Sequence, residues 1–480
     1  MTLPLPQAGP ADEGVEAAGV DSFVAALEAA PQIEPHSLML LRHGRVVAQG
    51  WWAPYAEHRP HLLYSVSKSF TGTAVAFAVQ EGLLGLDDTV LSRFPELDDE
   101  VTDPRSRSMK VRHLAAMASG HQDETIERAM VAGGGDLVRG FLTLPPDHDP
   151  GSVFAYNQPC TYTLAAMVQR ASGGSLTQYL RPRLFDPLGI TDVGWQRGPG
   201  GAELGFSGLH ATTDAVARLG LLHLQDGRWQ GEQLLPEGWV EQATRVHVAT
   251  PNQAGADWQQ GYGFQFWRSR HGYRADGAYG QFCVVLPELD VVLATTAATE
   301  DMQAILDAAW QHLLPAMHDE PLTGAVAAAA DRTLATRLAG LRLPVVTDVQ
   351  PEPAPGRVWS GRRADVGGQG PLERVEITRG DEGWVMELTD SVASYRVRLG
   401  TGDWVVTEPL DPDGAAVPLA TSGGWSDDDV LHVDVVFLET PHRLRVSWTG
   451  AGGSPATQRW LTTPLHAGRI SQLHSPRVPV

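Results

Sequence analysis

A serine and a lysine three residues apart, Ser65 and Lys68, have the clearest potential for chemistry in this sequence. The chain contains only two lysines, Lys68 and Lys110, among its 36 basic residues, so arginine supplies nearly every other positive charge. An arginine cannot lose its proton near neutral pH, whereas a lysine can when burial lowers its pKa. Lys68 could therefore act as a base toward the Ser65 hydroxyl, which would make Ser65 a nucleophile.

The pair lies at the start of a predicted helix. Apolar residues recur at helical spacing over residues 65–82, and a glycine ends the pattern. If Ser65 stands in the first turn, Lys68 lies on the same face of the helix, one turn later. The helix N-terminus also favours the negative charge that develops on an attacked carbonyl. The alternative interpretation is a helix-capping serine beside a solvated lysine.

Length and composition indicate a globular protein with two or three domains. The chain has 480 residues, of which 42% are hydrophobic and 19% are charged. The net charge of -21 argues against binding to nucleic acid or to an anionic membrane surface. No signal peptide and no long apolar run are recognisable, so a cytoplasmic location is expected. The two cysteines, Cys160 and Cys283, have no metal-binding spacing, so no metal is expected.

The order of the predicted elements indicates one antiparallel sheet assembled from both ends of the first 320 residues. A hairpin is expected near the start, a helix-rich region follows, and further strands and a helix close this part. The strands are expected at 36–42, 45–51, 262–268, 280–286 and 291–296, and the closing helix at 302–317.

A change of texture separates this part from the rest of the chain. Residues 321–356 combine an alanine-rich helical segment with a Pro-rich linker. From 357 to 480, short alternating strands are separated by Gly and Asp turns, which is typical of a small antiparallel barrel or sandwich. Three parts are therefore expected, with residues 1–320 as the part that holds the candidate nucleophile.

The stretch around Ser65 resembles the penicillin-recognising serine hydrolases, which include class C β-lactamases, D,D-peptidases, family VIII esterases and 6-aminohexanoate-dimer hydrolases. The resemblance covers roughly residues 20 to 318. It implies an α/β fold of the class C β-lactamase type, an antiparallel sheet flanked by helices with a helical subdomain. The C-terminal barrel is expected to be lipocalin-like, as in some relatives. The matching motifs follow in order at 63–72, 81–88, 111–120, 150–156, 208–214 and 261–264.

The resemblance implies a second catalytic residue, Tyr156. In the family's Tyr-x-Asn motif the tyrosine oxygen lies beside the nucleophile and relays protons to the leaving group. Here the motif is Tyr156-Asn157-Gln158, so a longer amide, Gln158, stands where the family has a substrate-binding asparagine. Which of Lys68 and Tyr156 is the base stays open. Alternatively, Tyr156 is a core aromatic residue with a satisfied hydroxyl.

The third motif departs further from the family pattern. Ala275-Asp276-Gly277 stands where the family has Lys-Thr-Gly or His-x-Gly, so the basic residue that helps to hold a substrate carboxylate is missing. Residues 277–281 are similar to the Gly-x-x-Gly-Gln of the 6-aminohexanoate-dimer hydrolases, which implies substrate contacts at Gly277, Gly280 and Gln281. The resemblance also implies that the N–H groups of Ser65 and Ala278 form the oxyanion hole.

These observations predict a serine hydrolase that acts through an acyl-enzyme on small esters or amides. No metal or organic cofactor is implied, and the expected partner is a small-molecule substrate. An acyltransferase or peptide cyclase could use the same acyl-enzyme. A penicillin-binding-like sensor with little turnover is the non-enzymatic alternative, against which the intact Ser65, Lys68 and Tyr156 argue. The missing basic residue at Ala275 favours esters or unusual amides over β-lactams.

Overall fold

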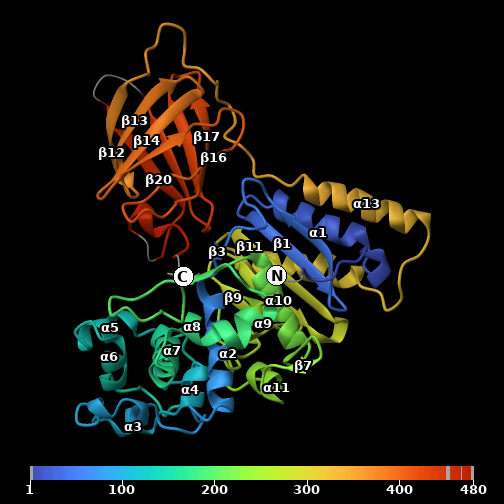
Figure 1. The fold of residues 1–480 in the computed structure, drawn as a ribbon, viewed down its shortest axis with the longest axis vertical. Coiled ribbons are helices and arrows are strands. Elements are labelled where there is room, and N and C mark those ends of the chain that lie inside the picture. The colour runs from blue at the N-terminus through green and yellow to red at the C-terminus, as the bar shows by residue number, and fades with distance from the viewer. Residues whose placement is uncertain (1–3, 450–453, 466–467, 477–480) are drawn as a thin grey trace.

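The computed structural model describes residues 4–449, 454–465 and 468–476. Its N-terminal part is built on a six-stranded antiparallel sheet with the order β2-β1-β11-β10-β9-β8 (Figure 1). Two strands come from the start of the chain and four from its middle, so the predicted assembly from both ends is confirmed. The strands are β1 (Glu34–Arg42), β2 (Arg45–Trp51), β8 (Trp267–Arg268), β9 (Tyr273–Gly277), β10 (Gln281–Leu286) and β11 (Val291–Ala298).

Alternating side chains of this sheet build two cores, one on each face. On β1, Leu38 and Leu40 contribute to one core, whereas Met39 and Leu41 contribute to the other. Helices cover both faces, so the strands are buried on both sides. The helices of the first core are α1 (Ala17–Ala29), α12 (Met302–His312) and α13 (Ala325–Ala339), and those of the second include α2 (Ser67–Gln80) and α10 (Thr213–Leu224).

Helix α2, which begins two residues after the predicted nucleophile Ser65, is buried inside the second core. All of its residues from Ser67 to Ala78 are buried. The buried hydroxyls find acceptors, because Ser69 donates to the Gln265 carbonyl at 2.6 Å and Thr71 to the Gly205 carbonyl at 2.8 Å. These bonds tie α2 to segments far away in the sequence and leave little freedom to its first turn.

A helical region packs against α2 and lies below the sheet in Figure 1. Its helix α7 contacts α2, α4 and α6 and carries the second predicted motif at its start. Within the described residues, no helix combines the length and apolar character needed to cross a bilayer. The helices of this region are α3 (Pro104–Ser108), α4 (Val111–Ala115), α5 (Ile126–Ala132), α6 (Leu137–Thr143), α7 (Gln158–Ser172) and α8 (Leu176–Leu180).

The predicted strand at 262–268 is wrong over most of its length. Only Trp267–Arg268 forms a strand, β8, because the chain turns at Gln265, whose φ is 63°. The Gln265 side chain is buried and donates to the Ala115 carbonyl at 2.9 Å, while its oxygen accepts from Thr161 at 2.6 Å. The segment therefore packs onto the helical region instead of extending the sheet.

The C-terminal strands form a nine-stranded sheet that curls into a nearly closed barrel (Figure 1). Its neighbours are antiparallel except β12 with β20, which are parallel. The barrel has its own core, in which Trp359, Trp425 and Trp448 are buried. The strands are β12 (Arg362–Gln369), β13 (Leu372–Gly380), β14 (Gly383–Asp390), β15 (Ser394–Arg398), β16 (Val405–Thr407), β17 (Leu419–Trp425), β18 (Leu431–Phe437), β19 (Arg443–Trp448) and β20 (Ala456–Thr462).

The barrel docks beside a small sheet that adjoins the predicted nucleophile. This sheet has the order β3-β5-β4, with β3 (His61–Leu62), β4 (Val193–Trp195) and β5 (Leu209–Ala211). The Leu62 N–H donates to the Glu439 carbonyl of the barrel at 2.8 Å. Nearby, the Tyr55 hydroxyl donates to the Thr440 carbonyl at 2.9 Å. The end of β3 is therefore connected to the barrel only a few residues before Ser65.

Candidate active site

Ser65 and Lys68 lie together at the junction of a short 3-10 turn, Tyr64–Val66, and helix α2. The Lys68 Nζ donates to the Ser65 Oγ at 2.9 Å. It also donates to the carbonyl of Phe206 at 2.8 Å and to the side-chain oxygen of Gln158 at 2.6 Å. Ser65 is half-buried, whereas Lys68 is only 1% exposed, so Lys68 is much better shielded from water than Ser65.

The environment of Lys68 favours its neutral form. Burial lowers the pKa of Lys68 to about 7, although the negative charges of Glu124 and Asp276 raise it. A neutral amine at hydrogen-bond distance from a hydroxyl can accept its proton. With this distance and this lowered pKa, the Lys68 amine would be able to accept the Ser65 proton.

Tyr156 joins this pair from the segment before α7. Its ring lies under Lys68, with the Nζ 4.7 Å from the ring centroid, and it stacks on the indole of Trp267 at 5.5 Å. Burial and the charge of Asp276 raise the pKa of the Tyr156 hydroxyl well above its usual value, and a hydrogen bond with Ser65 lowers it in part. The phenol therefore stays protonated at neutral pH, when Lys68 is close to half-deprotonated.

The other two residues of the second motif have different contacts: Gln158 contacts Lys68, and Asn157 contacts a neighbouring loop. The Gln158 oxygen accepts from Lys68, so this side chain contacts the predicted base directly. The backbone N–H of Gln158 donates to the carboxylate of Glu124 at 3.1 Å. The Asn157 side chain is buried and accepts from both the N–H and the hydroxyl of Thr125 at 2.9 Å. Asn157 thus fastens the start of α7 to the loop that precedes α5.

The end of β9 lies against the nucleophile. A Cβ added at Gly277 would stand 2.1 Å from the Leu63 carbonyl oxygen and 3.0 Å from the Ser65 nitrogen. Only a glycine lets these two backbones approach so closely. The turn that follows places Ala278 in contact with a small cluster of Leu62, Tyr64 and Tyr279. The structure therefore brings the two predicted oxyanion donors, Ser65 and Ala278, to adjoining segments.

Gly280 and Gln281 support this turn from behind. The Gln281 side chain is buried and donates to the carbonyls of Ala278 at 3.0 Å and Ala297 at 2.8 Å. A Cβ at Gly280 would stand 2.6 Å from the Ile305 side chain. Their predicted substrate contacts stay predictions, while the observed contacts fix the position of Ala278 against β11.

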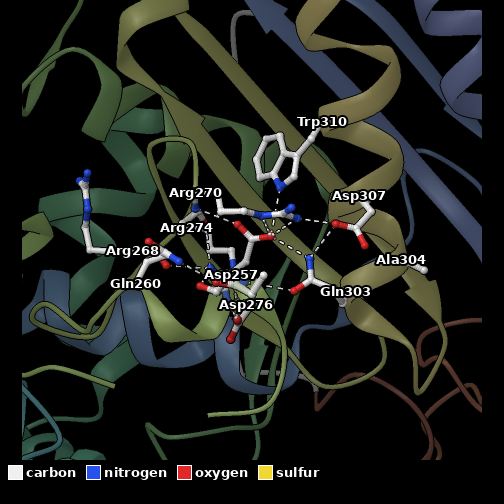
Figure 2. A network of polar contacts seen from close by, with 12 residues as sticks. Asp257, Gln260, Arg268, Arg270, Arg274, Asp276, Gln303, Ala304, Asp307 and Trp310 are labelled. Carbon is white, nitrogen blue, oxygen red and sulfur yellow. Dashed lines mark hydrogen bonds and ion pairs between the residues drawn. The ribbon is translucent and has the colours of Figure 1, made fainter. Parts of the chain in front are cut away.

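A polar network surrounds Arg274 and Asp276 of β9, and sequence reasoning missed it (Figure 2). The buried Arg274 stacks on Trp258 at 4.3 Å and donates to Asp276 at 3.2 Å and to the Asp257 carbonyl at 3.0 Å. Although burial raises it, hydrogen bonds from Arg270, Gln303 and Trp310 lower the pKa of Asp257 to about 2. The guanidinium of Arg274 thus makes its hydrogen bonds to groups of the protein itself, among them Asp276, the Asp257 carbonyl and Ser269.

Sequence reasoning also missed Phe206, whose carbonyl accepts from Lys68, because a backbone acceptor leaves no mark on residue type. Asp276 was visible inside the third motif, and its charge acts on both Lys68 and Tyr156. In the part of the chain that the structure describes, no cluster of three or more His, Cys, Asp or Glu side chains could hold a metal ion.

Comparison with known proteins identifies the family of the chain. Residues 20–316 match the family model described as Beta-lactamase. The lovastatin esterase of Penicillium rubens is 32% identical over 152 residues, which are 27% of this chain and 38% of that protein. The 6-aminohexanoate-dimer hydrolase of Paenarthrobacter ureafaciens is 26% identical over 291 residues, 55% of this chain and 73% of that protein.

Solved structures show the same fold. A putative 6-aminohexanoate-dimer hydrolase from Bacillus anthracis superposes with a TM-score of 0.53 at 21% identity, covering 65% of this chain and 86% of that one. The chain belongs to the beta-lactamase family of serine hydrolases. Relatives in this family include an esterase, hydrolases and an acyltransferase.

Proposed function

We propose that this protein hydrolyses small esters or amides through an acyl-enzyme, with Ser65 as the nucleophile and Lys68 as its base. The observation that carries the proposal is the 2.9 Å contact between the Ser65 hydroxyl and a lysine whose pKa burial lowers to about 7. Tyr156, whose pKa is raised, is suited to donate a proton and not to accept one. Lys68 is therefore the better candidate for the base.

The reaction follows from these positions. The Ser65 oxygen gives its proton to neutral Lys68 and attacks the substrate carbonyl, and the N–H groups of Ser65 and Ala278 stabilise the resulting oxyanion. As the tetrahedral intermediate collapses, Tyr156 gives its proton to the leaving group, and the Lys68 ammonium returns a proton to Tyr156. A water molecule then attacks the acyl-enzyme by the same route and releases the acid.

The residues of the third motif favour substrates without a carboxylate at this position. Ala275 offers no cation, and the neighbouring Arg274 is directed into bonds with Asp276 and Ser269. A carboxylate such as that of a β-lactam would therefore find no counter-charge from these two positions. We infer that esters and neutral amides are better substrates than penicillins or D-alanyl peptides.

Covalent labelling tests the nucleophile directly. A fluorophosphonate should add one phosphonyl group to the wild-type protein and none to Ser65→Ala, as read by intact mass. A wild-type protein that stays unlabelled while a control serine hydrolase reacts would overturn the assignment of Ser65. Turnover of nitrophenyl esters, linear ω-amino amides and nitrocefin then ranks the substrate classes.

Acyl transfer is the second candidate function, and the acyltransferase among the relatives favours it. The same acyl-enzyme would pass its acyl group to an amine or alcohol instead of water. Adding such an acceptor at increasing concentration to an ester assay separates the two functions. Product that partitions to the acyl-transfer adduct at low acceptor concentration indicates a transferase, whereas free acid throughout indicates a hydrolase.

The pH dependence of acylation should report Lys68. Below a pH of about 7 the amine is protonated and cannot accept the Ser65 proton, so kcat/KM should fall about tenfold per pH unit. Above it the amine is neutral and kcat/KM should reach a plateau, because Tyr156 keeps its proton there. Steady-state rates with a nitrophenyl ester from about pH 5.5 to 9 measure this profile. A rate that is flat across the range would exclude Lys68 as the base.

A further inference from the structure

Two tyrosines flank the proposed oxyanion donors, and both have unusual backbones. Tyr64 directly precedes Ser65, and Tyr279 directly follows Ala278. The φ angles are 47° at Tyr64 and 69° at Tyr279, in the left-handed region that bulky residues rarely adopt. Such conformations persist only where the surrounding structure enforces them. The peptide units that carry the two proposed donors are therefore next to residues that need outside support.

The C-terminal barrel supplies this support through the two side chains. The Tyr64 hydroxyl lies 2.7 Å from the Nε2 of His442, and the Tyr279 hydroxyl donates to the Thr463 carbonyl at 2.5 Å. The Leu465 N–H also donates to the Tyr64 hydroxyl at 3.4 Å. The hydroxyl groups of both tyrosines thus form hydrogen bonds with residues of the C-terminal barrel.

The tautomer of His442 follows from its other contact. Its Nδ1 lies 3.1 Å from the Thr462 carbonyl, an acceptor, so the Nδ1 must donate. Burial lowers the pKa of His442 to about 3, so the ring is neutral and its Nε2 is an acceptor. Tyr64 therefore donates its hydroxyl proton to His442, and this bond has a fixed direction at any ordinary pH.

The three rings also pack against one another. Ring centroids lie 5.6 Å apart for Tyr64 and Tyr279, 5.9 Å for Tyr64 and His442, and 5.8 Å for Tyr279 and His442, all edge to face. All three residues are buried. This triangle couples the segment of Ser65, the turn of Ala278 and the barrel in one rigid contact.

We infer that the C-terminal barrel is a working part of the active site, because its residues His442 and Thr463 position Tyr64 and Tyr279 and thereby aim the Ser65 and Ala278 N–H groups. The inference rests on the proposed function, since it assumes an oxyanion at these two donors. Tyr64, Tyr279 and His442 are positioning residues, because none of them needs to touch the substrate.

Another tyrosine provides a matched control. The Tyr55 hydroxyl also donates across the same interface to a barrel carbonyl, that of Thr440, at 2.9 Å. Tyr55 is buried like Tyr64, but it precedes β3 and adjoins neither proposed donor. We expect Tyr55→Phe to remove a comparable bond to the barrel and to leave the proposed oxyanion donors in place.

The test compares Tyr64→Phe, Tyr279→Phe and Tyr55→Phe in the full-length protein. Each variant is measured for ester kcat and KM, for inhibition by an arylboronic acid, and for thermal midpoint. We expect Tyr64→Phe and Tyr279→Phe each to lower kcat about tenfold with little change in KM, because donors that are misaimed weaken transition-state binding alone. The arylboronic acid forms a tetrahedral adduct with the serine, so its inhibition of both variants should weaken in parallel with kcat. Tyr55→Phe should keep wild-type kcat.

A double variant tests whether the effect of Tyr64 depends on His442 of the barrel. If Tyr64 acts through His442, Tyr64→Phe with His442→Phe should lose no more kcat than the worse single variant. The inference is overturned if Tyr64→Phe and Tyr279→Phe keep wild-type kcat, or if Tyr55→Phe loses as much as they do. Fluorophosphonate labelling of the wild type at Ser65, performed first, separates this outcome from failure of the proposed function. Absence of that labelling would overturn both.

Discussion

Replacing Lys68 with methionine should lower kcat/KM for an ester by about 10³ while the protein stays folded. Methionine has a similar length and no charge, so it suits a site that is only 1% exposed. The variant loses the amine that lies 2.9 Å from the Ser65 oxygen, and a general base of this kind contributes roughly 10² to 10⁴ in rate. Steady-state ester kinetics and the rate of fluorophosphonate labelling both measure the loss.

Two further variants make this prediction specific. Lys68→Arg keeps a positive charge near Ser65 but cannot accept a proton, so its activity should fall as far as that of the methionine variant. Lys110→Arg changes the only other lysine, which is exposed and pairs with Asp87 at 3.1 Å, and it should behave as wild type. Activity in Lys68→Arg within about tenfold of wild type would show that Lys68 acts through its charge and not as a base.

Gly277→Ala should lower kcat at least about 100-fold. The added Cβ would stand 2.1 Å from the Leu63 carbonyl oxygen, which is backbone and cannot rotate away. The end of β9 must therefore move away from the segment of Ser65, and Ala278 moves with it. Loss of one preorganised oxyanion donor costs roughly 10² to 10³ in kcat. Steady-state kinetics measure kcat, and a thermal melt measures how much stability is lost with it.

The matched control is another glycine in a strand. Gly367 in β12 has no atom within 4 Å of its would-be Cβ and no left-handed φ, so Gly367→Ala should leave both activity and folding unchanged. If Gly277→Ala retains wild-type kcat in a folded protein, the close approach of β9 is not needed for catalysis. An unfolded Gly277→Ala together with an unaffected Gly367→Ala would show that the approach is required for the fold itself.

The proposed catalytic residues could be singled out from the sequence because they lie in short motifs. Ser65 and Lys68 are one helical turn apart, so their contact follows from helix geometry once the helix is predicted. The central strands could be predicted as well, since apolar runs such as 291–296 are bounded by turn residues. The strand predicted at 262–268 was wrong because Gln265 makes buried hydrogen bonds to the helical region, which no local pattern indicates.

The contacts of the barrel with the segment of Ser65, and the backbone acceptors of the site, could not be predicted from the sequence. Tyr64 and His442 are 378 residues apart in the chain, and neither has neighbours that mark the other as its partner. The acceptor role of the Phe206 carbonyl is likewise invisible, because any residue type could supply it. Such contacts depend on the register and docking of whole elements, which are decided by packing over the entire fold.

The order of the central sheet has a consequence for the growing chain on the ribosome. Strand β1 lies between β2 and β11, so its second neighbour emerges only after more than half of the chain has been made. The turn that carries Ser65 and the helix α2 after it are synthesised early, but β9 and its glycine follow about two hundred residues later. Until then the segment of Ser65, the proposed nucleophile, has no neighbouring β9 and the sheet has an open edge. A nascent chain that ends before β9 therefore lacks one proposed oxyanion donor, and the β1 edge of its β1–β2 hairpin is unpaired until β11 has been made.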